Sequence, residues 1–365
     1  MSEWQTFCLK DLVKIFGGST PPTNNPKNYG NKIRWITAKD LSTLQGRYIK
    51  KGSRSISRLG FKSCSTFLLP KHAILFSVRA PIGYTAIISK RSCTDRGLMG
   101  LVPNKKIYFE FLYYLLKYHK HNISNMGVGT TFKGISKPAL GLFQVKIPPT
   151  YYEQQKIART LSVLDQKIEN NHKINELLHT LAYKIYEYYF KYKPKNAKLE
   201  QIIIENPKSS IMVKNAQKTQ DKYPFFTSGD NILSYPKAII DGRNCFLNTG
   251  GNAGIKFYVG KASYSTDTWC ICANEFSDYL YLLLSSIKTH INQSFFQGTS
   301  LKHLQKNLIK KYPIYMPSAH EIKKFNQIIM PLLTLISINT RTSKKLEQIR
   351  DFLLPLLLKQ QVKPQ

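Results

Sequence analysis

Several segments of the sequence approach a catalytic motif without completing it. A phosphate-binding loop has a glycine, four residues and then Gly-Lys-Ser/Thr, whereas residues 254–262 have five intervening residues and an alanine after the lysine. Residues 20–23 and 147–150 contain two prolines, but neither the amide nor the aromatic ring of the tetrad with which amino-methyltransferases hold a base. Glu321 and Lys323 have the acid-x-Lys spacing of a metal-dependent nuclease, but no Pro-Asp pair precedes them. We therefore expect no catalytic residues in this chain.

The cysteines and histidines do not have the spacing of metal ligands. The six cysteines stand at positions 8, 64, 93, 245, 270 and 272. The close pair, Cys270 and Cys272, has one intervening residue, whereas zinc and redox motifs have two. The histidines are scattered without ligand or triad spacing. We expect no metal site, and we interpret the cysteines as the reduced thiols of a cytoplasmic protein.

The charge of the chain predicts a polyanionic partner. Lysine and arginine number 54 against 21 acidic residues, which gives a formal net charge of +33. Such an excess repels itself unless a polyanion neutralises it. Nucleic acid is the first candidate, and an anionic membrane is the second. The longest apolar stretch, residues 352–358, contains Pro355 and is far shorter than the roughly 20 residues of a spanning helix, and the first residues do not resemble a secretion signal. We therefore expect no membrane partner.

The chain contains an internal repeat with an offset near 170 residues. The segment Gly-Thr-Thr-Phe-Lys at 129–133 matches Gly-Thr-Ser-Leu-Lys at 298–302. Three weaker matches occur in the same order in both halves, namely 36–40 with 226–230, 90–95 with 261–267, and 147–149 with 316–318. A repeat of this kind indicates two copies of one structural unit.

After each proline segment, apolar residues recur at alternating steps of four and three, which is the seam of a coiled coil. The seam positions of the first copy are Ile157, Leu161, Leu164, Ile168, Asn171, Asn175, Leu178 and Ile185. Those of the second copy are Phe325, Ile329, Leu332, Ile336, Asn339, Ser343, Leu346 and Leu353, and Arg350 occupies one further position. One such seam is typical of any amphipathic helix. Two seams with the same polar break indicate helices that pack on each other.

The seams predict two helices of about 38 residues, each about 57 Å long at 1.5 Å per residue. Pro331 and Pro355 should kink the second helix. A buried asparagine at a seam position fixes the register of the pair. Two facing copies indicate an antiparallel pair with pseudo-two-fold symmetry, which would hold a globular domain at each end.

The segments before each helix consist of short β-branched and aromatic runs that alternate with glycine and proline turns. They predict strands at 33–37, 73–78, 84–88, 246–248 and 255–259, and helices at 108–118 and 278–288. The predicted fold class is therefore α+β, with two similar mixed α/β domains separated by two long antiparallel helices. The predicted bounds are 1–150 for the first domain, 151–196 for the first long helix and a linker, 197–317 for the second domain, and 318–365 for the second long helix.

The excess charge lies mainly in the first domain. Residues 1–150 have a net charge of +19, residues 151–196 of +3, residues 197–317 of +6, and residues 318–365 of +5. The first domain also contains seven of the eleven arginines. Because arginine reads guanine with two hydrogen bonds, we predict a G·C pair in the sequence bound by this domain. In the second domain, Asn244, Asn248 and Asn252 are candidates for adenine.

The loops at 129–137 and 298–306 combine glycine, hydroxyl groups and basic residues, which suits contacts to phosphate. The alternative is a tight turn in which Thr130 or Thr299 caps a helix. The candidate DNA-binding residues are Arg79, Lys90, Arg91, Arg96, Thr130, Thr131, Lys133, Lys137, Arg243, Asn248, Asn252, Lys256, Lys261, Thr299, Ser300, Lys302 and Lys306. Any single basic residue among them is also compatible with a plain solvated surface.

This organisation resembles the specificity subunit of Type I restriction-modification systems over nearly the whole chain. The most specific features are the two Gly-Thr elements and the run Pro-Pro-Thr-Tyr-Tyr-Glu-Gln-Gln-Lys-Ile at 148–157, whose second copy at 317–322 lacks the Gln pair. The resemblance implies two target-recognition domains that each read half of a bipartite double-stranded DNA site, with the helices as a spacer. It also implies that two methyltransferase (modification) subunits and restriction/translocase subunits are partners. S-adenosylmethionine, ATP and Mg would then bind those partners and not this chain.

Two other classes of function stay open at this point. One is a stand-alone restriction nuclease or methyltransferase component with its own activity. The other is an RNA-binding or architectural protein without a preferred DNA sequence. Activity of the purified chain without partners would favour the first, and equal affinity for shuffled DNA competitors would favour the second.

Overall fold

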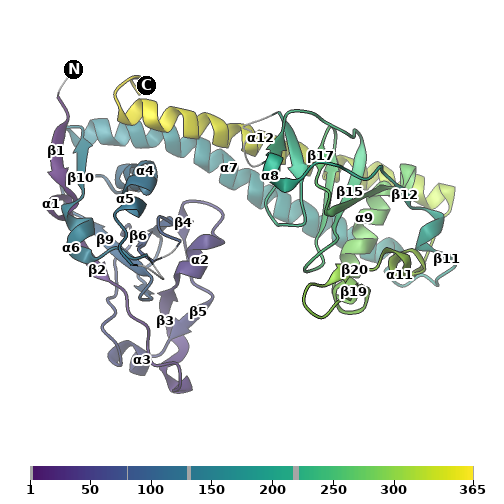
Figure 1. The fold of residues 1–365 in the computed structure, drawn as a ribbon, viewed down its shortest axis with the longest axis horizontal. Helices are drawn as coiled ribbons and strands as arrows, with labels where there is room; N and C mark the ends of the chain where they lie inside the picture. The colour runs from purple at the N-terminus through teal and green to yellow at the C-terminus, as the bar shows by residue number, and fades with distance from the viewer. Residues whose placement is uncertain (1–2, 80, 130–132, 217–221, 365) are drawn as a thin grey trace. The chain divides into compact units, whose positions relative to one another are not determined.

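The computed structural model describes residues 3–79, 81–129, 133–216 and 222–364 of the 365-residue chain. Contacts divide the chain into two compact units, Met1–Asn170 with Lys344–Gln365, and Asn171–Ser343. Each unit contains one mixed α/β domain and one stretch of each of the two long helices (Figure 1).

The core of the first unit is a five-stranded sheet that is covered on both faces. Its order is β2 (Val13–Gly17), β9 (Leu98–Pro103), β6 (Ile74–Ser77), β7 (Thr85–Ile88) and β4 (Tyr48–Ile49), and all neighbours are antiparallel except β7 and β4. Ile74 and Phe76 of β6 belong to the same hydrophobic cluster as helix α4 (Phe109–Tyr118), while Leu75 belongs to a second cluster with Ile36. Because side chains alternate along a strand, the apolar run of β6 supplies both faces.

The other elements of the first unit surround this sheet (Figure 1). A three-stranded sheet has the order β5 (Arg54–Ile56), β3 (Tyr29–Ile36) and β8 (Cys93–Thr94), and β1 (Gln5–Cys8) pairs with β10 (Gln144–Ile147). The short helices are α1 (Leu9–Leu12), α2 (Ala38–Ser42), α3 (Arg58–Lys62), α5 (Lys120–Asn125) and α6 (Lys137–Leu142), with a 3₁₀ turn at Pro26–Asn28.

The second unit contains a four-stranded sheet with the order β12 (Ile204–Glu205), β18 (Thr268–Cys272), β15 (Arg243–Asn248) and β16 (Ile255–Val259). A three-stranded sheet has the order β14 (Leu233–Tyr235), β13 (Tyr223–Phe226) and β17 (Ser263–Tyr264); β11 (Ala197–Lys198) pairs with β21 (Pro313–Ile314), and β19 (Phe296–Gln297) with β20 (His303–Leu304). The helices are α8 (Val213–Ala216), α9 (Ser277–Ser286), α10 (Lys288–His290) and α11 (Lys306–Lys310), with 3₁₀ turns at Leu199–Gln201 and Asn274–Phe276 and a π-helical turn at Ile291–Phe295.

The two units repeat one topology, which confirms the predicted internal repeat. In the first unit β6 is antiparallel to both β7 and β9, and β3 is parallel to β8. In the second unit β15 is antiparallel to both β16 and β18, and β13 is parallel to β17. In each unit, a helix of 10 residues, α4 or α9, follows the last of these strands. Both helices lie where the sequence predicts them.

The two long helices are close to the predicted length. Helix α7 (Tyr151–Tyr186) has 36 residues and continues into a π-helical turn at Glu187–Lys191, and helix α12 (Ala319–Leu358) has 40 residues. Helix α12 continues through Pro331 and Pro355, so neither proline ends the helix; the kinks predicted there stay a prediction.

Both long helices begin with the same kind of cap. The backbone N–H of Glu153 donates to Oγ1 of Thr150 at 3.2 Å, and that of Glu321 donates to Oγ of Ser318 at 3.3 Å. Each hydroxyl thus satisfies one of the free N–H groups of a helix start. The spacing Thr-x-x-Glu and Ser-x-x-Glu fixes both helix starts.

Candidate nucleic-acid interface

In the second unit, the predicted polar break of the seams joins the two long helices directly. Asn171 Nδ2 donates to Oγ of Ser343 at 3.1 Å. Asn339 Nδ2 donates to Oδ1 of Asn175 at 2.9 Å, and Asn175 Nδ2 lies 3.4 Å from the hydroxyl of Thr340. The residue numbers increase along α7 while those of their partners on α12 decrease, so the two helices run antiparallel, as predicted. Paired polar groups in an otherwise apolar seam oppose any shift of register.

In the first unit, the seam contains an ion pair that the sequence pattern does not reveal. Arg350 Nη1 lies 2.6 Å from Oδ1 of Asp165, whose other oxygen accepts a hydrogen bond from the Tyr114 hydroxyl at 2.6 Å. The Asp165 side chain is only 6% exposed. Burial raises the pKa of Tyr114 above its ordinary value, and the Asp165 charge raises it further. This network joins α7, α12 and α4.

The structure places the predicted packing residues on the inner faces of the helices. On α7, Ile157, Leu161, Ile168 and Asn171 are buried, and Leu164, Asn175, Leu178 and Ile185 are half-buried. On α12, Phe325, Ile329 and Ile336 are buried, and Leu332, Asn339, Leu346 and Leu353 are half-buried. Several of them also join the domain cores, since Leu161 clusters with α4 and Phe325 clusters with α9. The helices are therefore part of each compact unit.

A buried arginine ties the first domain to α7. The side chain of Arg47 is 7% exposed, and its guanidinium lies 3.0 Å from Glu110 at the start of α4 and 3.2 Å from Glu169 on α7. The Arg47 backbone N–H also donates to Glu169 at 2.8 Å. One of the seven arginines of the first domain is thus committed to the fold and is not free to read a base.

Arg243 has the equivalent role in the second unit, which corrects its prediction as a DNA contact. Its guanidinium makes a two-point ion pair with Asp278, the second residue of α9, whose side chain is 2% exposed. It also donates to the Thr334 hydroxyl at 3.0 Å and to the Met330 carbonyl at 3.2 Å, both on α12. Since these partners occupy its donors, Arg243 anchors the domain to the helix.

The predictions that Asn248 reads adenine and that Lys256 contacts DNA are also corrected, because both side chains bond inside the domain. Lys256 Nζ donates to the Thr227 carbonyl at 2.8 Å and to Asn248 Oδ1 at 3.0 Å, and burial lowers the pKa of this lysine. The Asn248 Nδ2 group donates to the Asn252 carbonyl at 3.1 Å. Asn244 is buried as well and accepts from Asn206 at 2.9 Å. Of the three candidate asparagines, Asn252 is exposed.

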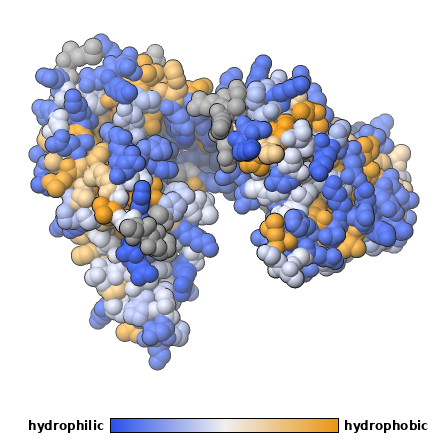
Figure 2. Space-filling model, in the orientation of Figure 1, coloured by the Kyte–Doolittle hydropathy of each residue, from blue (hydrophilic) through white to orange (hydrophobic). Residues whose placement is uncertain are grey.

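Most of the other candidates lie on the surface. The exposed ones are Arg79, Lys90, Arg91, Arg96, Lys133, Lys137, Asn252, Lys261, Thr299, Ser300 and Lys302. Lys306 is half-buried, since its amine lies 5.0 Å above the Trp269 ring and 3.8 Å from Glu205. Thr130 and Thr131 lie outside the described residues. Figure 2 shows hydrophilic residues over much of the visible surface of each unit.

The first glycine of each Gly-Thr loop has a positive φ, and neither Gly-Thr element supplies the N-cap of the helix that follows. Gly129 and Gly298 have φ values of 134° and 140°, in the region that favours glycine. Helix α6 is capped by the Ser136 hydroxyl, and the N-cap of α11 is Gln305. The expectation that Thr299 caps a helix is therefore wrong, which leaves its exposed hydroxyl available to a ligand.

Comparison with known proteins decides the family. The family described as "Type I restriction modification DNA specificity domain" matches residues 1–180 and 195–348. The chain belongs to this family.

One relative in this Type I specificity family matches along nearly the whole chain, and another matches over part of it. The specificity subunit of the Type I restriction enzyme MjaIX from Methanocaldococcus jannaschii is 29% identical, over 98% of this chain and 93% of that protein. The HindI specificity subunit from Haemophilus influenzae is also 29% identical, but over 31% of this chain. The crystal structure of a Type I S subunit from M. genitalium has a TM-score of 0.64 at 18% identity and covers 97% of this chain and 96% of that one. That structural likeness confirms the fold.

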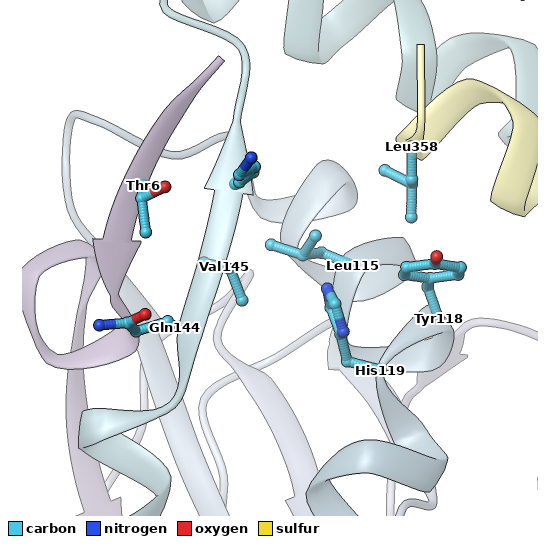
Figure 3. A pocket seen from close by; sticks show the side chains of 8 residues that line it. Thr6, Leu115, Tyr118, His119, Gln144, Val145 and Leu358 are labelled. Carbon is cyan, nitrogen blue, oxygen red and sulfur yellow. The ribbon is translucent and has the colours of Figure 1, made fainter. Parts of the chain in front are cut away.

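A pocket of about 380 Å³ lies in the first unit of this specificity-family chain (Figure 3). It is lined by Thr6, Leu115, Tyr118, His119, Gln144, Val145, Lys146 and Leu358. His119 Nδ1 has no hydrogen-bond partner among the described residues, and burial lowers the pKa of the imidazole. The residues that line the pocket do not include a paired nucleophile and base, so they do not form the arrangement that acid–base or nucleophilic catalysis needs.

Among the described residues, no group of three or more His, Cys, Asp or Glu side chains could hold a metal ion. In the same part of the chain, no helix is long and apolar enough to span a membrane. All six cysteines have free thiols.

Proposed function

We propose that this chain is the DNA-reading subunit of a cytoplasmic Type I restriction-modification complex, in which each unit reads one half of a bipartite double-stranded site. One observation carries the proposal. The two units repeat a single topology, and Gly129 and Gly298 share a positive φ, yet the units present different exposed side chains around these glycines. One fold used twice with different surface residues suits the reading of two different sequences.

The charge distribution supports DNA as the ligand and suggests that the two domains differ in their affinity for it. Residues 1–150 have a net charge of +19, and residues 197–317 have +6. Arg79, Arg91 and Arg96 of the first domain are exposed, whereas Arg243 of the second is engaged with Asp278. Phosphate neutralisation supplies most of the sequence-independent affinity, so the first domain should hold DNA more tightly. Its half-site should contain a G·C pair.

The long helices would set the distance between the half-sites and carry the partner subunits. In the second unit, apolar side chains that join no core are exposed on α7 at Ile174, Leu177 and Leu181, and on α12 at Leu335 and Ile338. Exposed apolar residues along a helix are typical of a protein–protein contact. Two modification subunits would dock on the helices, and restriction/translocase subunits would join them.

In this proposal the chain itself performs no reaction. S-adenosylmethionine, ATP and Mg²⁺ would bind the partner subunits, which would supply methyl transfer, translocation and cleavage. The chain would contribute only the choice of sequence. The alternative is a component with its own nuclease or methyltransferase activity.

A reconstitution experiment separates these functions. The purified chain is incubated with plasmid DNA, S-adenosylmethionine, ATP and Mg²⁺, alone and together with the modification subunit from the same genome. We expect methylation at one bipartite sequence in the mixture and neither methylation nor cleavage by the chain alone. Activity of the chain alone would support the alternative.

A further inference from the structure

Beside each Gly-Thr loop, three short backbone segments form a ladder. In the first unit, Gly134 forms antiparallel bridges with Val128 on one side and with Arg79 on the other. The N–H of Val128 donates to the Gly134 carbonyl and the N–H of Gly134 donates to the Val128 carbonyl, both at 3.0 Å. The N–H of Ile135 donates to the Val78 carbonyl at 2.9 Å.

The ladder recurs in the second unit with the same register. His303 pairs with Gln297 on one side and with Gly250 on the other. The N–H of Leu304 donates to the Thr249 carbonyl at 3.0 Å, which is the counterpart of the bond from Ile135 to Val78. The equivalent positions are therefore Arg79 and Gly250, Gly134 and His303, and Val128 and Gln297. We call Arg79, Gly134 and Val128 the first triad, and Gly250, His303 and Gln297 the second triad.

The ladder geometry directs the side chains of each triad to one face. Residues directly opposite each other in an antiparallel pair project to the same side, with about 5 Å between them. Arg79 and Val128 therefore flank Gly134 on one face, and no side chain rises between them. Across the triad the two flanking positions are about 10 Å apart, which equals about three base-pair steps of 3.4 Å.

The side chains of the triads are free for a ligand. Arg79, Val128, Gln297 and His303 are all exposed, and none of the ion pairs of the described residues involves Arg79. Val128 is 82% exposed, whereas a valine side chain stabilises a fold by hydrophobic burial only where it is buried. The fold therefore gains little from burial of this side chain, which is free to contact a thymine methyl group.

The backbone also tolerates other residues at the triad positions. A Cβ atom at Gly134 would meet only the Val78 carbonyl oxygen, at 3.7 Å, and one at Gly250 would meet nothing within 4 Å. Neither glycine has the positive φ that restricts larger residues. A fixed backbone with unconstrained side chains is what a domain needs in order to read different sequences.

We infer that the two triads read base edges in the major groove, one triad for each half-site. This rests on the proposed function. Arg79 pairs with O6 and N7 of a guanine, and Val128 contacts the methyl group of a thymine within about three base pairs of it. Gln297 pairs with N6 and N7 of an adenine, and His303 donates to a neighbouring purine N7. The neighbouring Lys133 and Lys302 contact phosphates.

Exchange of the triads tests the inference. One variant combines Arg79→Gly, Gly134→His and Val128→Gln, and its reciprocal combines Gly250→Arg, His303→Gly and Gln297→Val. Each chain, with its modification subunits, selects sequences from randomised duplex DNA. The first variant should lose the guanine in one half-site, with enrichment falling about 5- to 150-fold, and should gain an adenine there. The other half-site should not change, and the reciprocal variant should alter only that one.

Two further chains keep the test decisive. The variant Arg34→Ala removes an exposed arginine of the first domain outside the triad and should leave the selected sequence unchanged. The single change Gly250→Arg enters open space, so its fold should survive and its half-site should gain a guanine. If the unaltered chain selects a bipartite sequence and all the triad variants select the same one, the inference is overturned and the proposed function stands. If the unaltered chain selects no sequence, the proposed function fails, and the inference fails with it.

Discussion

Lengthening both long helices should lengthen the unread gap between the half-sites by a calculable amount. The unit boundary crosses α7 between Asn170 and Asn171 and crosses α12 between Ser343 and Lys344. Because the helices run antiparallel, equal insertions at these two points preserve the pairing of Asn171 with Ser343 and of Asp165 with Arg350. Each insertion should repeat the apolar seam.

Three heptads add 21 residues to each helix, or about 32 Å at 1.5 Å per residue, which corresponds to about 9 bp at 3.4 Å per base pair. Since about 10 bp make one turn of DNA, the two units should still meet the same side of the duplex. We expect a gap longer by about 9 bp with little loss of affinity. One heptad adds about 10 Å and about 3 bp, which turns the second half-site away from its reader and should weaken binding strongly.

Selection from randomised duplexes reads out the gap for each chain, and circular dichroism verifies the added helix. An unchanged gap in the three-heptad chain would refute the helices as a spacer. Equal affinity of the one-heptad and three-heptad chains would show that the helices do not fix which side of the duplex each half-site must face.

Three other outcomes follow from the structure. Arg243→Met leaves the Asp278 carboxylate buried without its partner, so we expect the free energy of unfolding, measured with urea, to fall by about 3–5 kcal/mol. The control Lys237→Met, at an exposed position, should change this free energy by about 0.5 kcal/mol or less. A loss of under about 1 kcal/mol for Arg243→Met would contradict its role as an anchor. Hydrogen bonds from the Ser318 backbone N–H and the Tyr315 hydroxyl lower the pKa of Glu321. The stability that Glu321 gives the fold is therefore complete above the ordinary glutamate pKa and is lost as pH falls through the lowered pKa. Glu321→Gln should remove this part of the dependence of stability on acid pH, and an unaltered pH profile would exclude the cap as its cause. Affinity for DNA should fall linearly on a log–log plot against salt, and alanine at Lys133 should make that slope shallower by about 1 without altering the selected sequence; an unaltered slope would remove Lys133 from the phosphate contacts.

The sequence predicts the long helices well because their pattern is local. The apolar seam is recognised from residues only three and four positions apart, and the Thr-x-x-Glu and Ser-x-x-Glu caps mark where the helices start. The pairing of Asp165 with Arg350 is not visible in this way, because a charged residue in a seam looks like solvent-facing surface until its partner, 185 positions away, is known. Arg350 at a seam position of the second copy was the one available signal, since Asp165 stands beside the seam position Leu164 and not on it.

Buried polar side chains account for the errors in the candidate site. Composition marks Arg243, Asn248 and Lys256 as DNA contacts, but all three are held by partners that the tertiary fold brings close to them. Arg79 is among the candidates predicted from the sequence, but its grouping with Val128 and Gly134 is not. Arg79, Val128 and Gly134 become neighbours only through backbone pairing between distant segments, and no spacing in the sequence reports that pairing.

Selection of randomised duplex DNA by the unaltered chain, in complex with its modification subunits, tests most directly whether two similar domains read two separate half-sites. We expect two short specified runs whose centres lie roughly 10 bp apart. Positions without preference should separate them, and one run should contain a G·C pair. One continuous specified sequence, or no enrichment over shuffled competitors, would contradict this expectation.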